Sequence, residues 1–484
     1  MINVLKLNIL PRASFYMIMT LSLCLITACL FIPNVYAKII VIIALGVFIF
    51  VCERKMKLLI PGSPGFIFWF GNFVPYIIGG LGSMFVVNAW GESDIRSYEN
   101  ALFYLGIGFS FYVVGMLCAH AFIASEKESG ISLLDININP LSVCMFSLII
   151  MFPVVLMTLI VESSFESIYY NLIIGPLMTI DKLPVILLAI YLFQRKPKWW
   201  VIILLFVGSL ATSLGGISIG YGRQKIPIAV VTLSIVYISM HWVYKKRMPY
   251  LGKWLLFLSP FILIILFIIN TVYRDNINLD HIASMEEKGE ALIYSGRELF
   301  YAGNMSIESA FPLFDRLVEK ESIELMNMAE SGSIEKAGWT TGDIKQILLS
   351  WVPKIFYPEK GVGYGRDIME YYGLCAPWNN IPVTVLADTF RRSGVVGVIM
   401  IYFMMGVLST TIALKLKGKY GAFGVVLAYF FALLHLDLNN WDALSVFTLY
   451  IYRFISGGLV IYAIMRISGM LHAGIFSSNL RPVL

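Results

Sequence analysis

The chain has 484 residues, of which 58% are hydrophobic and 14% are charged, and its mean hydropathy is +0.80. A soluble domain normally carries about a quarter charged residues, so this composition excludes an ordinary soluble protein and requires lipid as the solvent. The formal net charge is +6, and the Lys and Arg residues are distributed over many loops, which excludes a concentrated nucleic-acid-binding patch.

Apolar runs close to 20 residues long recur along the chain, and a helix of that length crosses about 30 Å of hydrocarbon. The first run follows Lys6 and Arg12, lacks a small-residue cleavage site and is followed at once by another run, so it predicts a retained helix rather than a signal peptide. Twelve spans are predicted in all. Nine are strong, at residues 14–32, 64–88, 100–123, 140–161, 199–217, 226–243, 251–272, 394–414 and 443–465, and three are shorter or interrupted, at residues 38–52, 172–193 and 421–437.

Basic residues are concentrated in alternate loops, which the positive-inside rule assigns to the cytoplasm, whereas the opposite loops are acidic or neutral. We therefore expect an all-α polytopic membrane protein with both termini in the cytoplasm. Residues 1–272 would form nine spans, residues 273–392 a large extracytoplasmic loop, and residues 393–484 three further spans and a cytoplasmic tail. The loop carries helical patterns at residues 306–328 and 343–356, which favour a folded and mostly helical cap. Cys375 is the only cysteine of six in this loop, so no disulfide framework is predicted.

Arg223 and Lys225 break this charge rule, because they lie in a short outer loop between the seventh and eighth spans. Gly220 and Gly222 allow a close backbone approach to a ligand, and Pro227 suits the start of a helix whose N-terminus favours an anion such as phosphate. The alternative is a plain tight turn in which both basic side chains snorkel to the membrane surface.

Further arginines would suit a pyrophosphate if several of them converge on one cavity. Arg274 directly follows the ninth span, Arg297 lies in an apolar part of the loop, and Arg453 lies in the middle of the twelfth span. The planar guanidinium binds phosphate oxygens through two hydrogen bonds and stays charged, and a charge at the bilayer centre usually faces a bundle interior. A surface salt bridge such as Arg297 with Glu290, or an ion pair between helices, is the alternative reading.

Candidate general bases are not ranked by the sequence. His281 and His435 are predicted near the outer face, where either can titrate near neutral pH, although a solvent-exposed or satisfied histidine is the commoner case. No spacing of His, Cys and carboxylates is typical of a metal site, so no metal is predicted. Four carboxylates are also available as proton acceptors: Asp275, Asp280, Glu298 and Asp388.

Residues 200–410 resemble the O-antigen polymerase and ligase superfamily, specifically the Wzy-type polymerases. The resemblance rests on the order of several short segments, together with twelve spans and a large loop between the ninth and tenth. These segments are Gly220-Tyr221-Gly222-Arg223, Ser295-Gly296-Arg297, Val352-Pro353-Lys354-Ile355-Phe356-Tyr357-Pro358-Glu359-Lys360, Gly361-Val362-Gly363-Tyr364-Gly365, Trp378-Asn379-Asn380 and Ala387-Asp388 leading through Arg391-Arg392-Ser393-Gly394-Val395-Val396-Gly397. Related proteins often have a histidine before the asparagine ahead of the tenth span, where this chain has Asn379-Asn380.

The resemblance implies a GT-C-like helical bundle and a metal-independent glycosyltransferase without a cofactor. Its substrate would be an undecaprenyl-pyrophosphate-linked oligosaccharide, whose growing chain is transferred en bloc to an incoming repeat unit on the outer side of the bacterial cytoplasmic membrane. Arg223 and Arg297 would be catalytic. Substrate-binding roles would fall to Lys225, Arg274, Arg366, Asn379, Asn380 and Arg453.

Membrane lipid and a chain-length regulator protein are the other partners expected, and nucleic acid is not. Three other function classes stay open on the sequence. A ligase of the same superfamily would transfer finished polymer to a lipid A core, a flippase or other transporter would use the spans and their charges without forming a bond, and a receptor or structural protein would account for the outer loop but not for Arg453.

Overall fold

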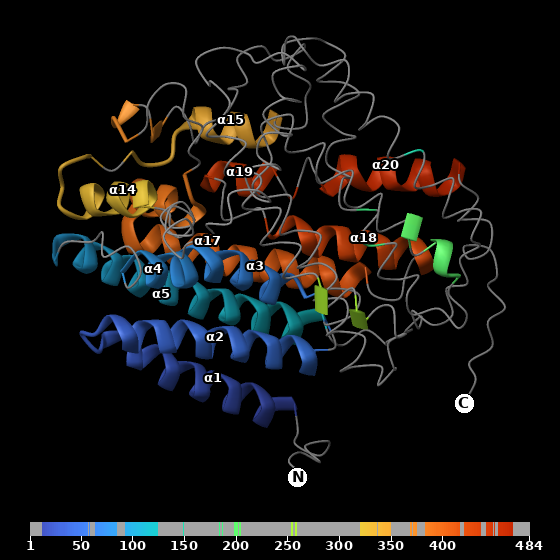
Figure 1. The fold of residues 1–484 in the computed structure, drawn as a ribbon, viewed down its shortest axis with the longest axis horizontal. Helices are drawn as coiled ribbons and strands as arrows, with labels where there is room; N and C mark the ends of the chain where they lie inside the picture. Colours follow the sequence, from blue (N-terminus) through green and yellow to red (C-terminus); the bar gives the residue numbers. More distant parts are fainter. Residues whose placement is uncertain are drawn as a thin grey trace, which may run out of the picture.

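The computed structural model describes eight stretches of the chain in full or nearly so. They are residues 12–56, 63–84, 92–123, 320–349 (without 336), 383–416, 421–436, 442–450 (without 449) and 454–467, to which residues 58, 149, 183, 186, 198–201, 203–204, 253–254, 257–258, 368–369 and 371–374 are added. All regular elements in these stretches are helices (Figure 1).

Five helices in the described residues are long and apolar enough to cross a membrane. Their spans are Ser14–Phe31, Val35–Lys55, Pro64–Gly82, Asp94–Ile123 and Val385–Leu416. The chain is therefore a multi-pass helical membrane protein, and these five helices correspond to the predicted spans at residues 14–32, 38–52, 64–88, 100–123 and 394–414.

The structure describes the other seven predicted spans only in part or hardly at all. The span at residues 421–437 corresponds to α18 (Gly421–Leu434), and the one at residues 443–465 is divided between α19 (Ala443–Thr448) and α20 (Phe454–Ile467). The spans at residues 140–161, 172–193, 199–217, 226–243 and 251–272 lie almost wholly outside the described residues. The total of twelve stays a prediction.

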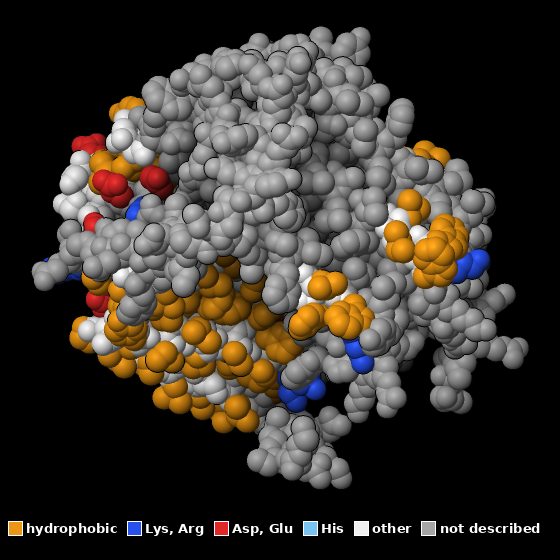
Figure 2. All heavy atoms as spheres, in the orientation of Figure 1, with side chains coloured by type: hydrophobic (Ala, Val, Ile, Leu, Met, Phe, Trp, Pro, Cys, Tyr) orange, Lys and Arg blue, Asp and Glu red, His pale blue; other side chains and the backbone are white. Residues whose placement is uncertain are grey.

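Helices α1 (Arg12–Ala28) and α2 (Val35–Lys55) form one exposed apolar side of the described bundle. On α2 the large side chains of Ile40, Ile43 and Val47 are exposed, whereas Ile42 and Leu45 are fully buried. Figure 2 shows the resulting apolar surface over these two helices. An exposed face of this kind is stable only against hydrocarbon, since in water it would be a large unpartnered apolar patch.

The centre of the described bundle is the pair α5 (Glu92–Ile123) and α17 (Val385–Leu416), which pack along much of their lengths. Glycine allows their backbones to touch. A Cβ atom added at Gly406 would lie 2.1 Å from the carbonyl oxygen of Tyr112, and one added at Gly115 would lie 2.3 Å from that of Phe403. The Tyr112 hydroxyl bonds to Ser409 Oγ at 2.7 Å beside the crossing. Small residues at such contacts are the usual basis of helix association in membranes.

The third span is not a continuous α-helix. It consists of α3 (Pro64–Phe73), the π-helix η2 (Val74–Gly79) and the short α4 (Gly80–Gly82). Pro75 lies within η2 and lacks a backbone N–H, which favours a local break in the α-helical hydrogen-bond ladder. The buried Tyr98 hydroxyl of α5 donates to the carbonyl oxygen of Tyr76, so the break is stabilised by a neighbouring helix.

Two helices of the predicted loop pack against the bundle: α14 (Lys320–Glu330) and α15 (Thr341–Leu349). The Glu330 carboxylate of α14 accepts hydrogen bonds from Asn100 Nδ2 at 2.9 Å and from the Tyr104 hydroxyl at 2.7 Å, both on α5. The loop is therefore folded and helical where it is described. Helix α14 ends two residues after the predicted pattern at residues 306–328, and α15 begins two residues before the pattern at residues 343–356. The rest of both patterns lies outside the described residues.

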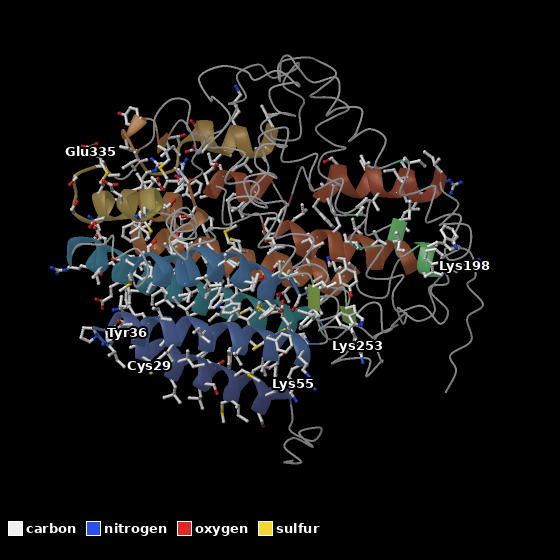
Figure 3. All side chains as sticks on the ribbon, viewed as in Figure 1. Cys29, Tyr36, Lys55, Lys198, Lys253 and Glu335 are labelled. Carbon is white, nitrogen blue, oxygen red and sulfur yellow. The ribbon has the colours of Figure 1, made fainter. Side chains whose placement is uncertain are left out.

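The two ends of the bundle are marked by different residues. Lys55, Lys198 and Lys253, all from predicted cytoplasmic loops, lie toward one end (Figure 3). Glu335 and Tyr36 lie at the opposite end, where α14 is also found (Figures 1 and 3). We call these the lysine end and the loop end. The predicted boundary between residues 392 and 393 falls inside α17 at the loop end, because this helix already begins at Val385.

Candidate functional site

A cluster of four buried charged residues lies at the loop end of α17. It consists of Asp388, Arg391 and Arg392 from α17 and Asp343 from α15, and each residue is no more than 5% exposed. Asp388 stands three and four positions before the two arginines, a spacing that places all three side chains on one face of a helix.

The first turn of α17 is fixed by Thr384. Its Oγ1 accepts a hydrogen bond from the Ala387 amide at 3.2 Å, and its backbone carbonyl accepts the Asp388 amide at 3.0 Å. A threonine in this N-cap position satisfies an amide that the helix itself leaves without a partner. Thr384 Oγ1 also bonds to the Tyr76 hydroxyl at 3.0 Å, so the start of α17 is attached to the interrupted third span.

Asp388 is fully buried and organises the cluster. Its Oδ1 accepts from Arg391 Nε at 3.2 Å and Nη2 at 2.6 Å, and its Oδ2 accepts from Arg392 Nε at 3.0 Å and from the Ala443 amide at 3.0 Å. Charge-assisted hydrogen bonds of this kind offset part of the large cost of taking a carboxylate out of water. With both oxygens bonded to cations or amides, Asp388 is a positioning residue rather than a free general base.

Arg392 joins α17 to the loop. Its Nη1 donates to Asp343 Oδ2 at 2.9 Å and to the Gly338 carbonyl at 3.2 Å, and the Gly338 amide donates to the Arg392 carbonyl at 3.1 Å. The guanidinium carbon lies 4.9 Å from the centre of the Trp339 ring, a cation–π distance, and Trp339 Nε1 donates to Ser393 Oγ at 3.0 Å. Because these contacts are all with other groups of the protein, the role of Arg392 is to hold the loop on the bundle.

Asp343 belongs to a capping box at the start of α15. The Thr340 amide and hydroxyl donate to Asp343 Oδ2 at 2.7 and 2.9 Å, and the Asp343 amide donates to Thr340 Oγ1 at 3.2 Å. Burial acts to raise the pKa of the Asp343 carboxyl, but the bonds from Thr340 and the neighbouring Arg392 outweigh it, so its pKa is below the ordinary value. The carboxylate is therefore charged at neutral pH.

Arg391 is the arginine with donors to spare. Within the described part of the chain its guanidinium bonds only to Asp388 Oδ1, through Nε and Nη2, and the Tyr372 ring lies 6.0 Å away. A guanidinium has five N–H donors, so most of its capacity is not used by these two bonds. The side chain is nonetheless buried, so its position is fixed by packing.

Gly394 separates this cluster from the membrane-crossing part of α17. Its φ of 61° and ψ of −150° fall in a region that only glycine adopts readily, and they break the helix into residues 385–393 and 395–416. At about 1.5 Å per residue the second part is about 33 Å long, enough to cross the hydrocarbon by itself. The charged cluster therefore lies at the edge of the apolar layer.

All eight predicted site residues lie outside the described residues, so their arrangement stays a prediction. They are Arg223, Lys225, Arg274, Arg297, Arg366, Asn379, Asn380 and Arg453. Of the candidate bases, His281, Asp275, Asp280 and Glu298 also lie outside, and Asp388 is bound as described above.

His435, the remaining candidate base, lies in the bundle interior. The ring is fully buried, with Nδ1 at 2.9 Å from the Phe431 carbonyl and Nε2 at 3.1 Å from the Tyr450 hydroxyl. A carbonyl requires Nδ1 to be the donor, so in the neutral ring Nε2 accepts from Tyr450. His435 is thus satisfied, which is the commoner of the two roles expected for it.

No group of three or more His, Cys, Asp or Glu side chains able to hold a metal occurs among the residues that the structure describes. Comparisons with family models, with curated proteins and with solved structures find no match to this chain.

Arg391 and Arg392 belong to one of the segments that carry the family resemblance but are not among the site residues predicted from the sequence. The signal was present, because two adjacent arginines directly before an apolar run, with an aspartate at i−3 and i−4, favour a helical ion cluster. Asp343 has no such local signal, since it precedes Arg392 by 49 positions in the chain.

Proposed function

We propose that this protein polymerises undecaprenyl-pyrophosphate-linked oligosaccharide repeat units on the outer side of the bacterial cytoplasmic membrane. The loop end would face outward, and both termini would be cytoplasmic. The observation that supports this proposal is a pair of buried arginines, Arg391 and Arg392. They lie at the edge of the apolar layer, at the loop end of the bundle. A lipid diphosphate has its charged group at this depth and its tail in the membrane.

The reaction has a simple balance. The acceptor hydroxyl of the incoming repeat unit attacks the anomeric carbon of the growing chain, a new C–O bond forms, and the C–O bond to pyrophosphate breaks. Undecaprenyl pyrophosphate leaves with the bonding electron pair, and the hydroxyl proton passes to a base. Because the donor is already activated by its pyrophosphate, the proposed reaction needs neither a metal nor a nucleotide sugar.

Guanidinium groups stabilise the charge that develops on the leaving pyrophosphate. In this proposal Arg223 and Arg297 supply the main contacts, as the sequence motifs imply, and Arg391 adds its spare donors at the rim. Asp388 positions Arg391 through its bonds to both arginines, and Arg392 holds the loop through its bond to Asp343. Lys225, Arg274, Arg366, Asn379, Asn380 and Arg453 would bind the rest of the two substrates.

The activity is tested by supplying the purified protein with a lipid-linked repeat unit. Growth of a ladder of polymers supports the proposal. Transfer of polymer to a lipid A core identifies a ligase instead, and movement of the lipid across a vesicle membrane without new glycosidic bonds identifies a transporter. Absence of all three reactions for several repeat units would overturn the proposal.

Arg391 is tested by Arg391→Ala and Arg391→Lys. Loss of one charge-stabilising donor typically lowers a rate by about 10² to 10³, and lysine keeps the charge but loses the planar fork, so it should restore only part of the rate. Arg96→Ala is the matched control, since Arg96 is an exposed arginine on α5 near the loop end. Gel filtration verifies folding. Wild-type ladders from a folded Arg391→Ala variant would remove Arg391 from the mechanism, and full ladders from Arg223→Ala and Arg297→Ala would contradict the mechanism itself.

A further inference from the structure

Helix α15 presents an exposed apolar face in the part of the protein that the structure describes. Ile344 and Leu348 stand one turn apart and are 54% and 60% exposed, while Asp343 on another side of the same helix is buried against Arg392. A helix that buries a charged residue and exposes its apolar ones has the reverse of the pattern expected in water. The environment of the exposed face must therefore be something other than bulk solvent.

The depth of α15 is set by its contacts with α17. Asp343 bonds to Arg392, Gly338 bonds to the Arg392 backbone, and Trp339 bonds to Ser393, so the start of α15 is level with the residue before Gly394. Gly394 is also where the membrane-crossing part of α17 begins. The first turn of α15 is thus at the boundary between the polar and apolar layers.

From this boundary α15 extends toward the membrane interior. Figure 1 shows α15 running alongside the direction of the spanning helices rather than across them. Leu348 is five residues beyond Asp343, which places it about 7.5 Å further along the axis at about 1.5 Å per residue. That distance carries Leu348 into the outer part of the hydrocarbon layer.

We propose that α15 is inserted into the outer leaflet and that Ile344 and Leu348 contact the acyl chains of bilayer phospholipids. The hydrogen bonds of a helical backbone are satisfied internally, so α15 can enter hydrocarbon without leaving polar groups unpaired. Trp339, 39% exposed, lies at the boundary, where tryptophan is enriched because its ring is apolar and its N–H is polar.

This inference does not depend on the proposed activity, because it concerns ordinary bilayer lipid. It is tested by replacing Ile344 or Leu348, one at a time, with the photoreactive residue p-benzoylphenylalanine in the full-length protein. The protein is placed in nanodiscs of phosphatidylethanolamine and phosphatidylglycerol with no lipid-linked sugar, irradiated and analysed by mass spectrometry. Met400, 55% exposed on the membrane-crossing part of α17, is the positive control, and the loop residue Glu335 is the negative control.

Phospholipid adducts at positions 344 and 348, in a yield similar to position 400 and absent at position 335, are the expected result. Two positions are used so that one poorly folded variant does not decide the outcome. Lipid adducts at neither position, with the probe at position 400 reacting normally, would overturn the proposal. So would adducts with another segment of the chain or with a second copy, because either result gives this face a protein partner.

Discussion

The contact between α5 and α17 predicts that Gly406→Ala destabilises the protein while a matched glycine substitution does not. A Cβ atom at position 406 would lie 2.1 Å from the Tyr112 carbonyl oxygen, and ordinary contact begins near 3.4 Å, so the two backbones must separate by about 1.3 Å. Neither partner is a flexible side chain that can move aside. Overpacking of a tight interior costs about 1–3 kcal/mol. Weakening the hydrogen bond between Tyr112 and Ser409 adds about 1 kcal/mol.

Gly458→Ala is the matched control. Its Cβ atom would lie 3.2 Å from Leu427 Cδ1, the end of a side chain that can rotate away, and alanine favours a helix over glycine by up to about 1 kcal/mol. We expect the apparent melting temperature in detergent to fall by several degrees for Gly406→Ala and to stay level or rise for Gly458→Ala. Equal melting temperatures for Gly406→Ala and the wild type would refute the backbone contact between α5 and α17.

Three further predictions concern the ends of helices. Gly394→Ala should cost about 1–3 kcal/mol, because alanine does not readily adopt the backbone angles found there, and it should lower the melting temperature. Glu53→Gln should also lower it. The fully buried Glu53 carboxylate accepts the Gly65 amide at 2.7 Å through one oxygen and the Phe66 amide at 3.1 Å through the other, whereas glutamine has a single acceptor oxygen, so one buried amide loses its acceptor at a cost of about 1–3 kcal/mol. Because the pKa of Asp343 is lowered, its contribution to folding is complete above the ordinary carboxyl value of about 3.9 and is lost as the pH falls through the lower folded-state pKa. Hydrogen exchange of α15 should therefore be insensitive to this group between about pH 5 and 8 and increase only in stronger acid, and Asp343→Asn should remove the acid-dependent step.

Hydropathy located the apolar centre of each described span but not its full length. The helix α5 begins at Glu92 instead of residue 100, and α17 begins at Val385 instead of residue 394. In both cases the additional turns carry charged residues, so a transfer scale excludes them from the span. These turns pack against α14, a tertiary contact that no local window contains.

The charged cluster could be predicted only in part. Asp388 forms a local i, i+3 and i, i+4 pattern with Arg391 and Arg392. The pattern predicts a cluster of ion pairs once residues 385–393 are assigned to a helix. The glycine that follows obscured this assignment, because a glycine before an apolar run usually marks the start of a helix and not a break within one. Asp343, the second acid of the cluster, precedes Arg392 by 49 positions, so no local sequence pattern contains their contact.

The kink at Gly394 explains why a buried ion cluster and a lipid-crossing helix can occupy consecutive residues. A straight helix would repeat the same faces along its length, so the face that carries Arg391 and Arg392 would continue down the helix as the face that must bury Gly406 against α5. The bulky guanidinium and carboxylate side chains of the cluster do not fit on a helix face whose backbone must touch the backbone of α5. The change of direction at one residue lets the first part of α17 pack on the loop and the second part pack on the bundle, and it fixes the charged groups at the depth where a lipid diphosphate would present its own.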